Sequence, residues 1–135
     1  MKAISTLLKL AQKNLDKLLL TKKSLNARLE EIQYSLSILQ KEMKNEINNY
    51  FNSEYRFFLD QYLKGANLKI DNFQKSIIDL EKQIEHINKD IMEHFAEIKR
   101  YEIIAENHRK EKIQAEHKQE ITNLDELTIL KYKND

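Results

Sequence analysis

The chain of 135 residues contains no proline and a single glycine, so it holds almost none of the residues that stop a helix. A chain of this length would carry about seven prolines at the ordinary usage of roughly 5%. Proline breaks a helix because it lacks a backbone N–H and its ring clashes with the preceding turn. The composition therefore predicts very long helices joined by few turns.

The charge and apolar content narrow the class further. Hydrophobic residues make up 41% of the chain, charged residues 33%, and the mean hydropathy is −0.70. This number of apolar side chains is enough for a narrow seam between helices but small for a broad globular core. A net charge of +1 gives no field that attracts nucleic acid or anionic lipid, so no nucleic-acid partner is expected. The absence of cysteine excludes disulfides and cysteine-based zinc sites. Lys9 and Lys13 interrupt the apolar start before it could form a signal peptide or a membrane span, which favours a cytoplasmic location.

The first part of the chain follows a heptad repeat, the pattern of coiled coils in which positions a and d are apolar. Of 14 such positions, 11 are apolar, and the exceptions are Lys22, Glu46 and Ser53. A single lysine at an a position can fix the register without breaking the seam. The positions of this first seam are Leu8, Ala11, Leu15, Leu18, Lys22, Leu25, Leu29, Ile32, Leu36, Leu39, Met43, Glu46, Tyr50 and Ser53.

The first seam ends where four asparagines and a serine gather between residues 45 and 53. Their side chains compete for backbone hydrogen bonds and so favour turns and helix caps. The sequence predicts a first helix over about 3–47, a turn at about 48–53 and a second helix over about 54–131. Ser53 is expected to be the N-cap of the second helix, with Glu54 in its first turn.

A second heptad seam continues without a slip across Gly65, which places this glycine inside a helix. An interior glycine costs only about 1 kcal/mol relative to alanine. The alternative is a hairpin turn at 64–67, near the midpoint of the chain. The positions of the second seam are Leu59, Leu63, Ala66, Ile70, Phe73, Ile77, Leu80, Ile84, Ile87 and Ile91.

Together the two seams predict an all-α fold: an elongated antiparallel two-helix coiled coil, or helical hairpin, forming a single domain over 1–135 with a longer second helix. The first helix runs out of partners near residue 100, so an unpaired overhang is expected from there. An isolated helix is marginally stable in water. The apolar residues of the overhang therefore need cover from another protein or a second copy; the alternative is a frayed, half-disordered tail.

Four aromatic residues form a helical stripe at spacings of i, i+4, i+7 and i+11: Phe51, Tyr55, Phe58 and Tyr62. From Tyr55 onward they lie off the second seam. Large aromatic residues are enriched at interfaces because they bury a large area while few rotatable bonds lose their freedom. The stripe predicts a contact surface for a partner. The alternative is a local cluster that seals the hairpin end, with Phe51 and Phe57 folded into the turn.

No pattern of catalytic or metal-binding residues is present in the sequence. None of the four histidines has another histidine three or four positions away, and none completes a Glu-x-x-His motif. A glycine-rich phosphate loop is also absent. We therefore expect no enzyme activity, no cofactor and no metal.

The order of several short motifs resembles the FliJ family of flagellar export proteins, which is related to the YscO-type secretion stalk proteins. The aromatic opening of the second helix is similar to the family's Tyr-x-x-Phe-[Ile/Leu] pattern, and the far end is similar to its acidic, Leu-Asp-Glu-ending helix. Ile121, Thr122 and Asn123 stand where the family has a more charged run. The residues that carry the resemblance are Leu7, Leu10, Ala11, Lys13, Tyr55 to Leu59, Tyr62, Gly65, Ala66, Glu102, Glu106, Glu116, Glu120 and Leu124 to Leu127.

This resemblance implies a central-stalk and adaptor protein that couples a hexameric secretion ATPase to the export gate. Export chaperones are further implied partners, and the protein would be cytoplasmic and peripheral to the inner-membrane export apparatus. The overhang would meet the ATPase ring through Ile113, Ile121, Leu124 and Leu127. The gate-facing surface carried over from the family maps to Ser35, Leu39, Glu42, Glu46, Phe58, Tyr62, Gly65 and Lys69.

An alternative function is a structural coiled coil that self-associates into a four-helix-bundle homodimer. In that case the aromatic stripe and the overhang would bind a second copy. At positions 42 and 46 of the gate-facing surface, glutamates replace the aromatic residues of some relatives.

Overall fold

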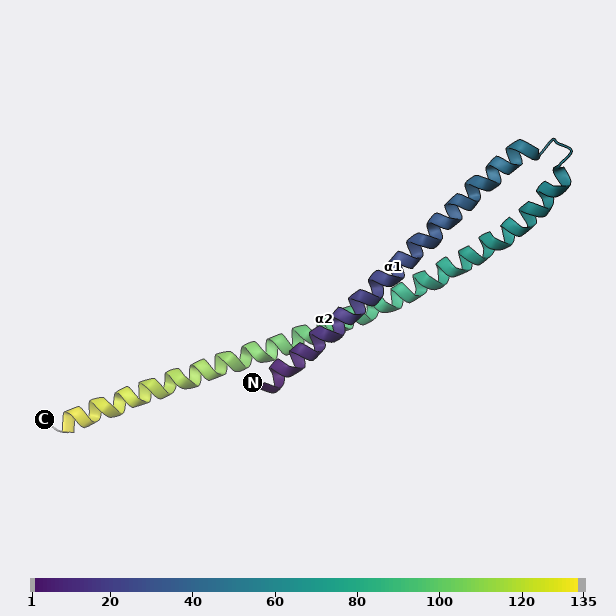
Figure 1. The fold of residues 1–135 in the computed structure, drawn as a ribbon. Helices are drawn as coiled ribbons and strands as arrows, with labels where there is room; N and C mark the ends of the chain where they lie inside the picture. Colours follow the sequence, from purple (N-terminus) through teal and green to yellow (C-terminus); the bar gives the residue numbers. More distant parts are fainter. Residues whose placement is uncertain (1, 134–135) are drawn as a thin grey trace. The chain divides into compact units, whose positions relative to one another are not determined.

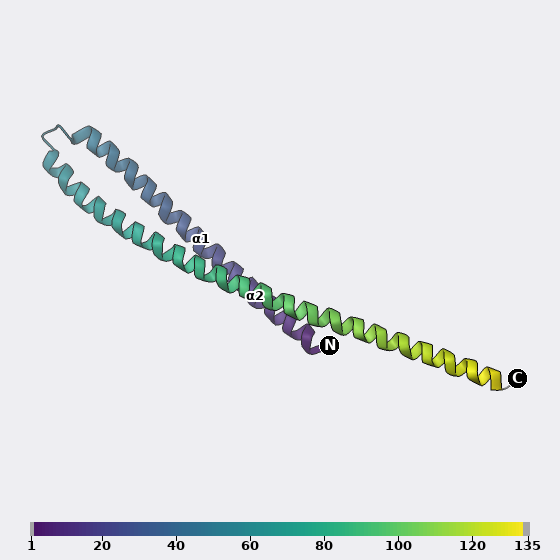
Figure 2. The same cartoon turned by 180° about the vertical axis from the view of Figure 1, so that it is seen from behind.

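The computed structural model describes residues 2–133, and 96% of them lie in two helices. Helix α1 spans Lys2–Tyr50 and helix α2 spans Arg56–Lys133. No strand occurs between residues 2 and 133. Figures 1 and 2 show the two helices joined by a short turn, with α2 continuing further than α1. The predicted class, an antiparallel helical hairpin with a longer second helix, is confirmed.

The chain divides into two compact units, which are described one at a time. The hairpin unit, Asp16–Met92, contains the turn and the parts of both helices next to it. The terminal unit combines Met1–Leu15 with Glu93–Asp135. Each unit therefore takes a piece of α1 and a piece of α2.

The core of the hairpin unit lies on the two predicted seams. All of its buried hydrophobic residues occupy a or d positions, and the remaining seam positions from Leu18 to Met43 and from Leu63 to Ile87 are half-buried. The buried residues are Leu25, Leu59, Ala66, Leu80 and Ile91. The predicted register is therefore the observed one.

Gly65 lies within α2, as the uninterrupted seam predicted. Its φ is not positive, and a Cβ built on it would meet nothing within 4 Å. The position thus requires neither the backbone freedom of glycine nor its small size. The alternative turn at 64–67 is wrong.

The two helices of the hairpin unit are covered unequally near the turn. No described residue of α1 from 26 to 50 is buried, although the seam positions there are mostly half-buried. On α2, by contrast, Leu59 and Ala66 are each only 4% exposed. The seam near the turn is therefore partly open on the side of α1.

The turn occupies residues 51–55 and begins three residues later than the predicted start at 48. Helical bonding continues through the asparagines, because the Phe51 N–H donates to the Ile47 carbonyl oxygen at 3.0 Å. Asn48 and Asn49 therefore remain in α1. Local backbone competition by asparagine is a weak preference, and here the helix continues past it.

Ser53 closes this turn with two hydrogen bonds. Its hydroxyl donates to the Tyr50 carbonyl oxygen at 2.8 Å and accepts from the Tyr55 N–H at 3.2 Å. Because α2 begins at Arg56, Ser53 is not the N-cap, and Glu54 lies before the first helical turn. Ser53, the predicted N-cap, therefore lies inside the turn, two residues before Tyr55, the residue that directly precedes α2.

In the terminal unit the start of α1 packs against α2. Ile4, Ala11 and Leu15 are buried on α1, and Ile98 is buried on α2. The half-buried seam positions of α2 continue to His108. The covered part therefore extends past residue 100, where the overhang was expected to begin. The later position of the turn explains this extension. In an antiparallel pair, moving the turn one residue towards the C-terminus moves the last paired residue of α2 by two.

From residue 109 to residue 133 every residue is exposed. This C-terminal segment is nevertheless helical through Lys133. In the structure this segment is a helix that no other part of residues 2–133 covers.

Candidate functional site

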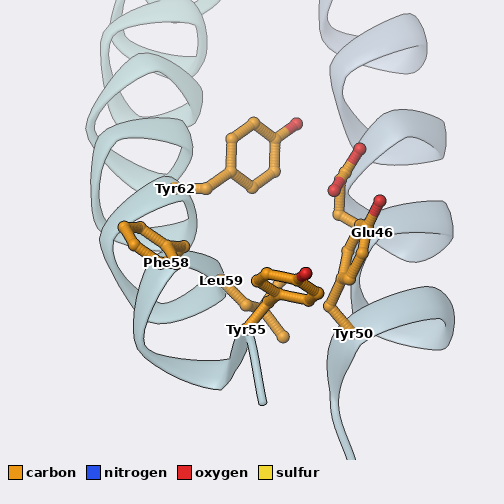
Figure 3. A pocket seen from close by; sticks show the side chains of 6 residues that line it. All are labelled: Glu46, Tyr50, Tyr55, Phe58, Leu59 and Tyr62. Atoms are coloured by element: carbon orange, nitrogen blue, oxygen red, sulfur yellow. The ribbon is translucent and has the colours of Figure 1, made fainter. Parts of the chain in front are cut away.

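An open hollow lies between the helices next to the turn, in the part of the seam that α1 leaves partly open. Its volume is about 730 Å³. Figure 3 shows side chains from both helices and from the turn around it. The residues lining this tip hollow are Glu46, Tyr50, Tyr55, Phe58, Leu59 and Tyr62.

The aromatic rings reach the hollow because they flank a buried seam residue. Phe58 and Tyr62 lie one position before and three positions after Leu59, so they stand beside the seam rather than in it. Phe58 is 68% exposed and Tyr62 is 37% exposed. Neither ring is a core residue of the hairpin.

Two further contacts fix the aromatic rings around the turn. Tyr50 and Tyr55 meet edge to face across it, with centroids 6.1 Å apart and planes at 88°. Phe57 and Phe58 meet in the same manner at 5.9 Å and 77°. Edge-to-face pairs of this kind are favoured by the ring quadrupole. The rings of the tip hollow are therefore held by their neighbours without being covered by them.

Arg56 holds Phe51 against the turn. Its guanidinium carbon lies 4.1 Å from the centre of the Phe51 ring, and Nη1 donates to the Phe51 carbonyl oxygen at 3.2 Å. The Nε atom also pairs with Asp60 Oδ1 at 3.3 Å. Phe51 thus takes part in a local cluster, as one interpretation of the stripe proposed. Phe57 is 67% exposed and contacts Phe58 rather than folding into the turn.

The tip hollow carries negative charge. Burial raises the pKa of the Tyr62 hydroxyl above 10.0, and the nearby carboxylates of Glu42 and Glu46 raise it further. Glu46 occupies a half-buried seam position where an apolar residue is usual. No lysine or arginine lines the hollow, and no ion pair found within residues 2–133 includes Glu42 or Glu46.

The structure brings together half of the residues assigned to the gate-facing surface. Glu46, Phe58 and Tyr62 line the tip hollow, and Glu42 is close enough to Tyr62 to shift its pKa. The other four follow the same spacing along each helix, and none of them lines the hollow. Leu39 is half-buried in the first seam, and those exposed are Ser35, Gly65 and Lys69.

Two residues at the tip were not singled out by the sequence. Tyr50 was counted as a seam position, yet its ring lines the hollow and meets Tyr55. Arg56 stands at a variable position of the Tyr-x-x-Phe pattern, yet its guanidinium lies over the Phe51 ring. An aromatic residue at the last a position before a break is the signal that could have indicated Tyr50.

The C-terminal segment presents a second uncovered apolar surface. Ile113, Ile121, Leu124 and Leu127 are all exposed, and their spacing places them on one side of α2. At the start of this segment, Arg109 Nη2 pairs with Glu106 Oε1 at 2.7 Å. That hydrogen bond holds the pKa of Glu106 below its usual value.

The remaining side chains suggest no other kind of site. Among residues 2–133, no group of three or more histidine, aspartate or glutamate side chains could hold a metal ion. His86 forms only an i,i+4 pair with Asp90, at 3.7 Å. No helix in the described range is both long enough and apolar enough to cross a membrane.

Comparison with known proteins gives one match. The family model described as Flagellar FliJ protein matches residues 1–135. No curated protein and no solved structure matched the chain. The match covers the whole of the given sequence and agrees with the resemblance of the aromatic and acidic motifs. The chain therefore belongs to the FliJ family of flagellar export proteins.

Proposed function

We propose that this protein is a central stalk and adaptor of the flagellar export apparatus. Its tip surface, defined as the tip hollow with Glu42, binds the cytoplasmic domain of the export gate. Its C-terminal segment binds the secretion ATPase hexamer. The single observation that carries the proposal is that two uncovered apolar surfaces lie in different compact units. One protein can then hold two partners without competition between them.

The tip surface suits a protein partner for energetic reasons. Phe58 offers most of its ring to solvent, and the half-buried seam next to it is incompletely covered. Aromatic side chains in such partly open sites are the residues that most often dominate binding energy. A partner that covers them gains apolar burial without first having to unfold the hairpin.

The C-terminal segment suits a partner that encloses it. Its residues from 109 to 133 are all exposed, so nothing within the described chain stabilises its helix by packing. A ring or bundle that surrounds the segment would cover the apolar side formed by Ile113, Ile121, Leu124 and Leu127. Export chaperones are a further class of partner, and we assign no residue to their binding. The protein itself would lie in the cytoplasm, at the inner-membrane export apparatus.

The test uses the double variant Phe58→Ala/Tyr62→Ala. We expect unchanged helicity by circular dichroism and at least about tenfold weaker binding to the gate domain by calorimetry. The matched control, Tyr34→Ala/Phe95→Ala, removes one exposed tyrosine and one exposed phenylalanine elsewhere and should bind normally. If Phe58→Ala/Tyr62→Ala loses its fold, the two rings are core residues and not a binding surface. Normal gate binding by a folded variant would refute the assignment.

A second candidate function is a self-associating scaffold. The same uncovered residues favour it, because two hairpins could cover each other in a four-helix bundle. Sedimentation of the purified protein separates the two candidates. A homodimer at low micromolar concentration would favour the scaffold, and a monomer that binds the ATPase would favour the stalk.

A further inference from the structure

We propose that the tip hollow is a receptor for a single basic side chain, arginine or lysine, projecting from a partner protein. The site is formed by the faces and hydroxyls of Tyr50, Tyr55 and Tyr62, by the ring of Phe58 and by the carboxylate of Glu46. This inference names the chemistry of the contact and does not depend on which protein supplies the cation.

The shape of the hollow fits such a side chain. Its volume of about 730 Å³ is larger than one arginine or lysine side chain needs, so the segment that carries the basic residue can enter as well. In Figure 3, Tyr62 reaches from α2 towards α1, and the carboxylate of Glu46 points into the same space. Leu59 forms an apolar floor that suits the methylene stem of a basic side chain.

The aromatic rings supply the first part of the attraction. A cation over the face of a tyrosine or phenylalanine ring is drawn to the negative face of the ring, most strongly where water is excluded. Three tyrosines and one phenylalanine line the hollow, and Tyr50 and Tyr55 contact each other. These two rings are in contact before a ligand arrives, which lowers the entropy cost of binding.

The carboxylates supply the second part. Glu46 is half-buried at a seam position, and no basic group of the described chain pairs with it. A carboxylate without a counter-ion attracts a cation, and a cation in the hollow would pair with it. The carboxylate of Glu42 adds negative charge near the Tyr62 hydroxyl. The hollow therefore selects against acidic and neutral side chains.

The one basic residue closest to the hollow in sequence is already engaged. Arg56 bonds the Phe51 carbonyl, lies over the Phe51 ring and pairs with Asp60. It does not line the hollow. The chain itself therefore does not fill the site it forms.

The test titrates the full chain with a blocked pentapeptide that has one arginine between two leucines. A second peptide carries citrulline, which has nearly the shape of arginine without its charge. Nuclear magnetic resonance of the tyrosine and phenylalanine rings reports binding. We expect the Tyr55 and Tyr62 ring signals to shift, with at least about fivefold higher affinity for the arginine peptide. Equal affinities, or no shift up to about 20 mM peptide, would overturn the proposal.

Two variants locate the effect. Glu46→Gln should lower the affinity for the arginine peptide by about threefold or more and leave the citrulline peptide unaffected. Glu31→Gln, an exposed glutamate elsewhere on α1, should change neither affinity. If both variants lose the same affinity for the arginine peptide, the attraction comes from the general surface charge, and the proposed site is refuted. A homodimer that Glu46→Gln abolishes and Glu31→Gln preserves would assign the hollow to a second copy instead of a partner protein.

Discussion

Tyr62 is the residue at which burial, aromatic packing and charge act together. It lies beside the seam, lines the tip hollow and faces two carboxylates of the other helix. Its pKa is raised because partial burial and negative neighbours both disfavour the phenolate. The charge distribution at the tip can therefore be measured at a single hydroxyl.

We predict that the pKa of Tyr62 lies above 10.0 and falls in the variant Glu42→Gln/Glu46→Gln. The pKa should still stay above 10.0 in that variant, because burial is the largest cause. Ring-resonance titration measures it, and Glu30→Gln/Glu31→Gln is the control. A wild-type pKa at or below 10.0 would contradict the described geometry.

The same shift has a consequence for stability. Tyr62 holds its proton more tightly in the folded state than in the unfolded state, so its contribution is complete below pH 10.0. That contribution is lost as the pH rises through the higher folded-state pKa. We predict that Tyr62→Phe makes the decline of unfolding free energy above pH 10 shallower than in the wild type. Urea melts at several alkaline pH values test this, and parallel curves would argue against it.

Gly65 offers the simplest gain in stability. Because it lies inside α2 with open space around its Cα, Gly65→Ala should raise the free energy of unfolding by about 1 kcal/mol. Asn67→Ala, an exposed neighbour in the same helix, should give a smaller gain. Urea denaturation compares the two variants. A loss of stability at Gly65 would show that the site is more crowded than the structure indicates.

At the scale of the element, the turn is held by few contacts. The hydroxyl of Ser53 supplies two of them, one to Tyr50 and one to Tyr55. Those residues also pair through their rings, so Ser53 and the aromatic contact close the same loop. The Ser53 side chain therefore contributes to the shape of the tip hollow, together with the contacts of Arg56 to Phe51.

We predict that Ser53→Ala lowers the free energy of unfolding by about 1 kcal/mol, because the Tyr50 carbonyl oxygen and the Tyr55 N–H each lose their hydrogen bond to the hydroxyl. Asn52→Ala, the adjacent turn residue, should cost less. Denaturant melts give the stabilities, and the ring signals of Tyr55 report the turn geometry. If both variants behave alike, the hydrogen bonds of Ser53 contribute no measurable stability.

The two seams could be predicted from the sequence, whereas the turn boundary could not. A seam is the sum of many apolar contacts, so one exception such as Lys22 does not move it. The end of α1 depends instead on a few local bonds, such as that from Phe51 to Ile47. Asn48 and Asn49 only weakly prefer a turn to a helix, and the backbone hydrogen bonds of α1 outweigh that preference.

The candidate site shows the same division between periodic and local features. The helical spacing of Tyr55, Phe58 and Tyr62 is enough to indicate a surface beside the seam. The part played by Tyr50 follows only from the geometry of the turn, which brings its ring to Tyr55. The nearness of Glu46 to Tyr62 depends on how α1 and α2 are paired, and a helical repeat by itself does not fix that pairing.

At the scale of the whole molecule, the packed residues and the longest fully exposed run of residues occupy different stretches of chain. The buried residues extend from Ile4 to Ile98, and every residue from 109 to 133 is exposed. Removal of the C-terminal segment should therefore leave the packed part of the protein intact.

We predict that truncation after His108 leaves the melting temperature within about 2 °C of the full chain. Binding to the gate domain should persist, and binding to the ATPase hexamer should be lost. Scanning calorimetry and co-sedimentation measure the two effects. Truncation after Ile91 is the contrasting variant, because it removes Ile98 and the α2 side of the terminal unit, and it should lower the melting temperature. Retained ATPase binding after truncation at His108 would refute the assignment of the C-terminal segment.

The exposure of residues 109–133 also bears on how the chain can evolve. A substitution in the seams alters packing against the other helix, so a compensating change can arise within the same protein. A substitution at Leu124 or Leu127 alters no such packing, because both side chains face solvent. Under the proposed function, compensation for it must come from the ATPase surface that covers the segment. Covariation should therefore link the seam positions to each other, and the C-terminal positions to a different gene.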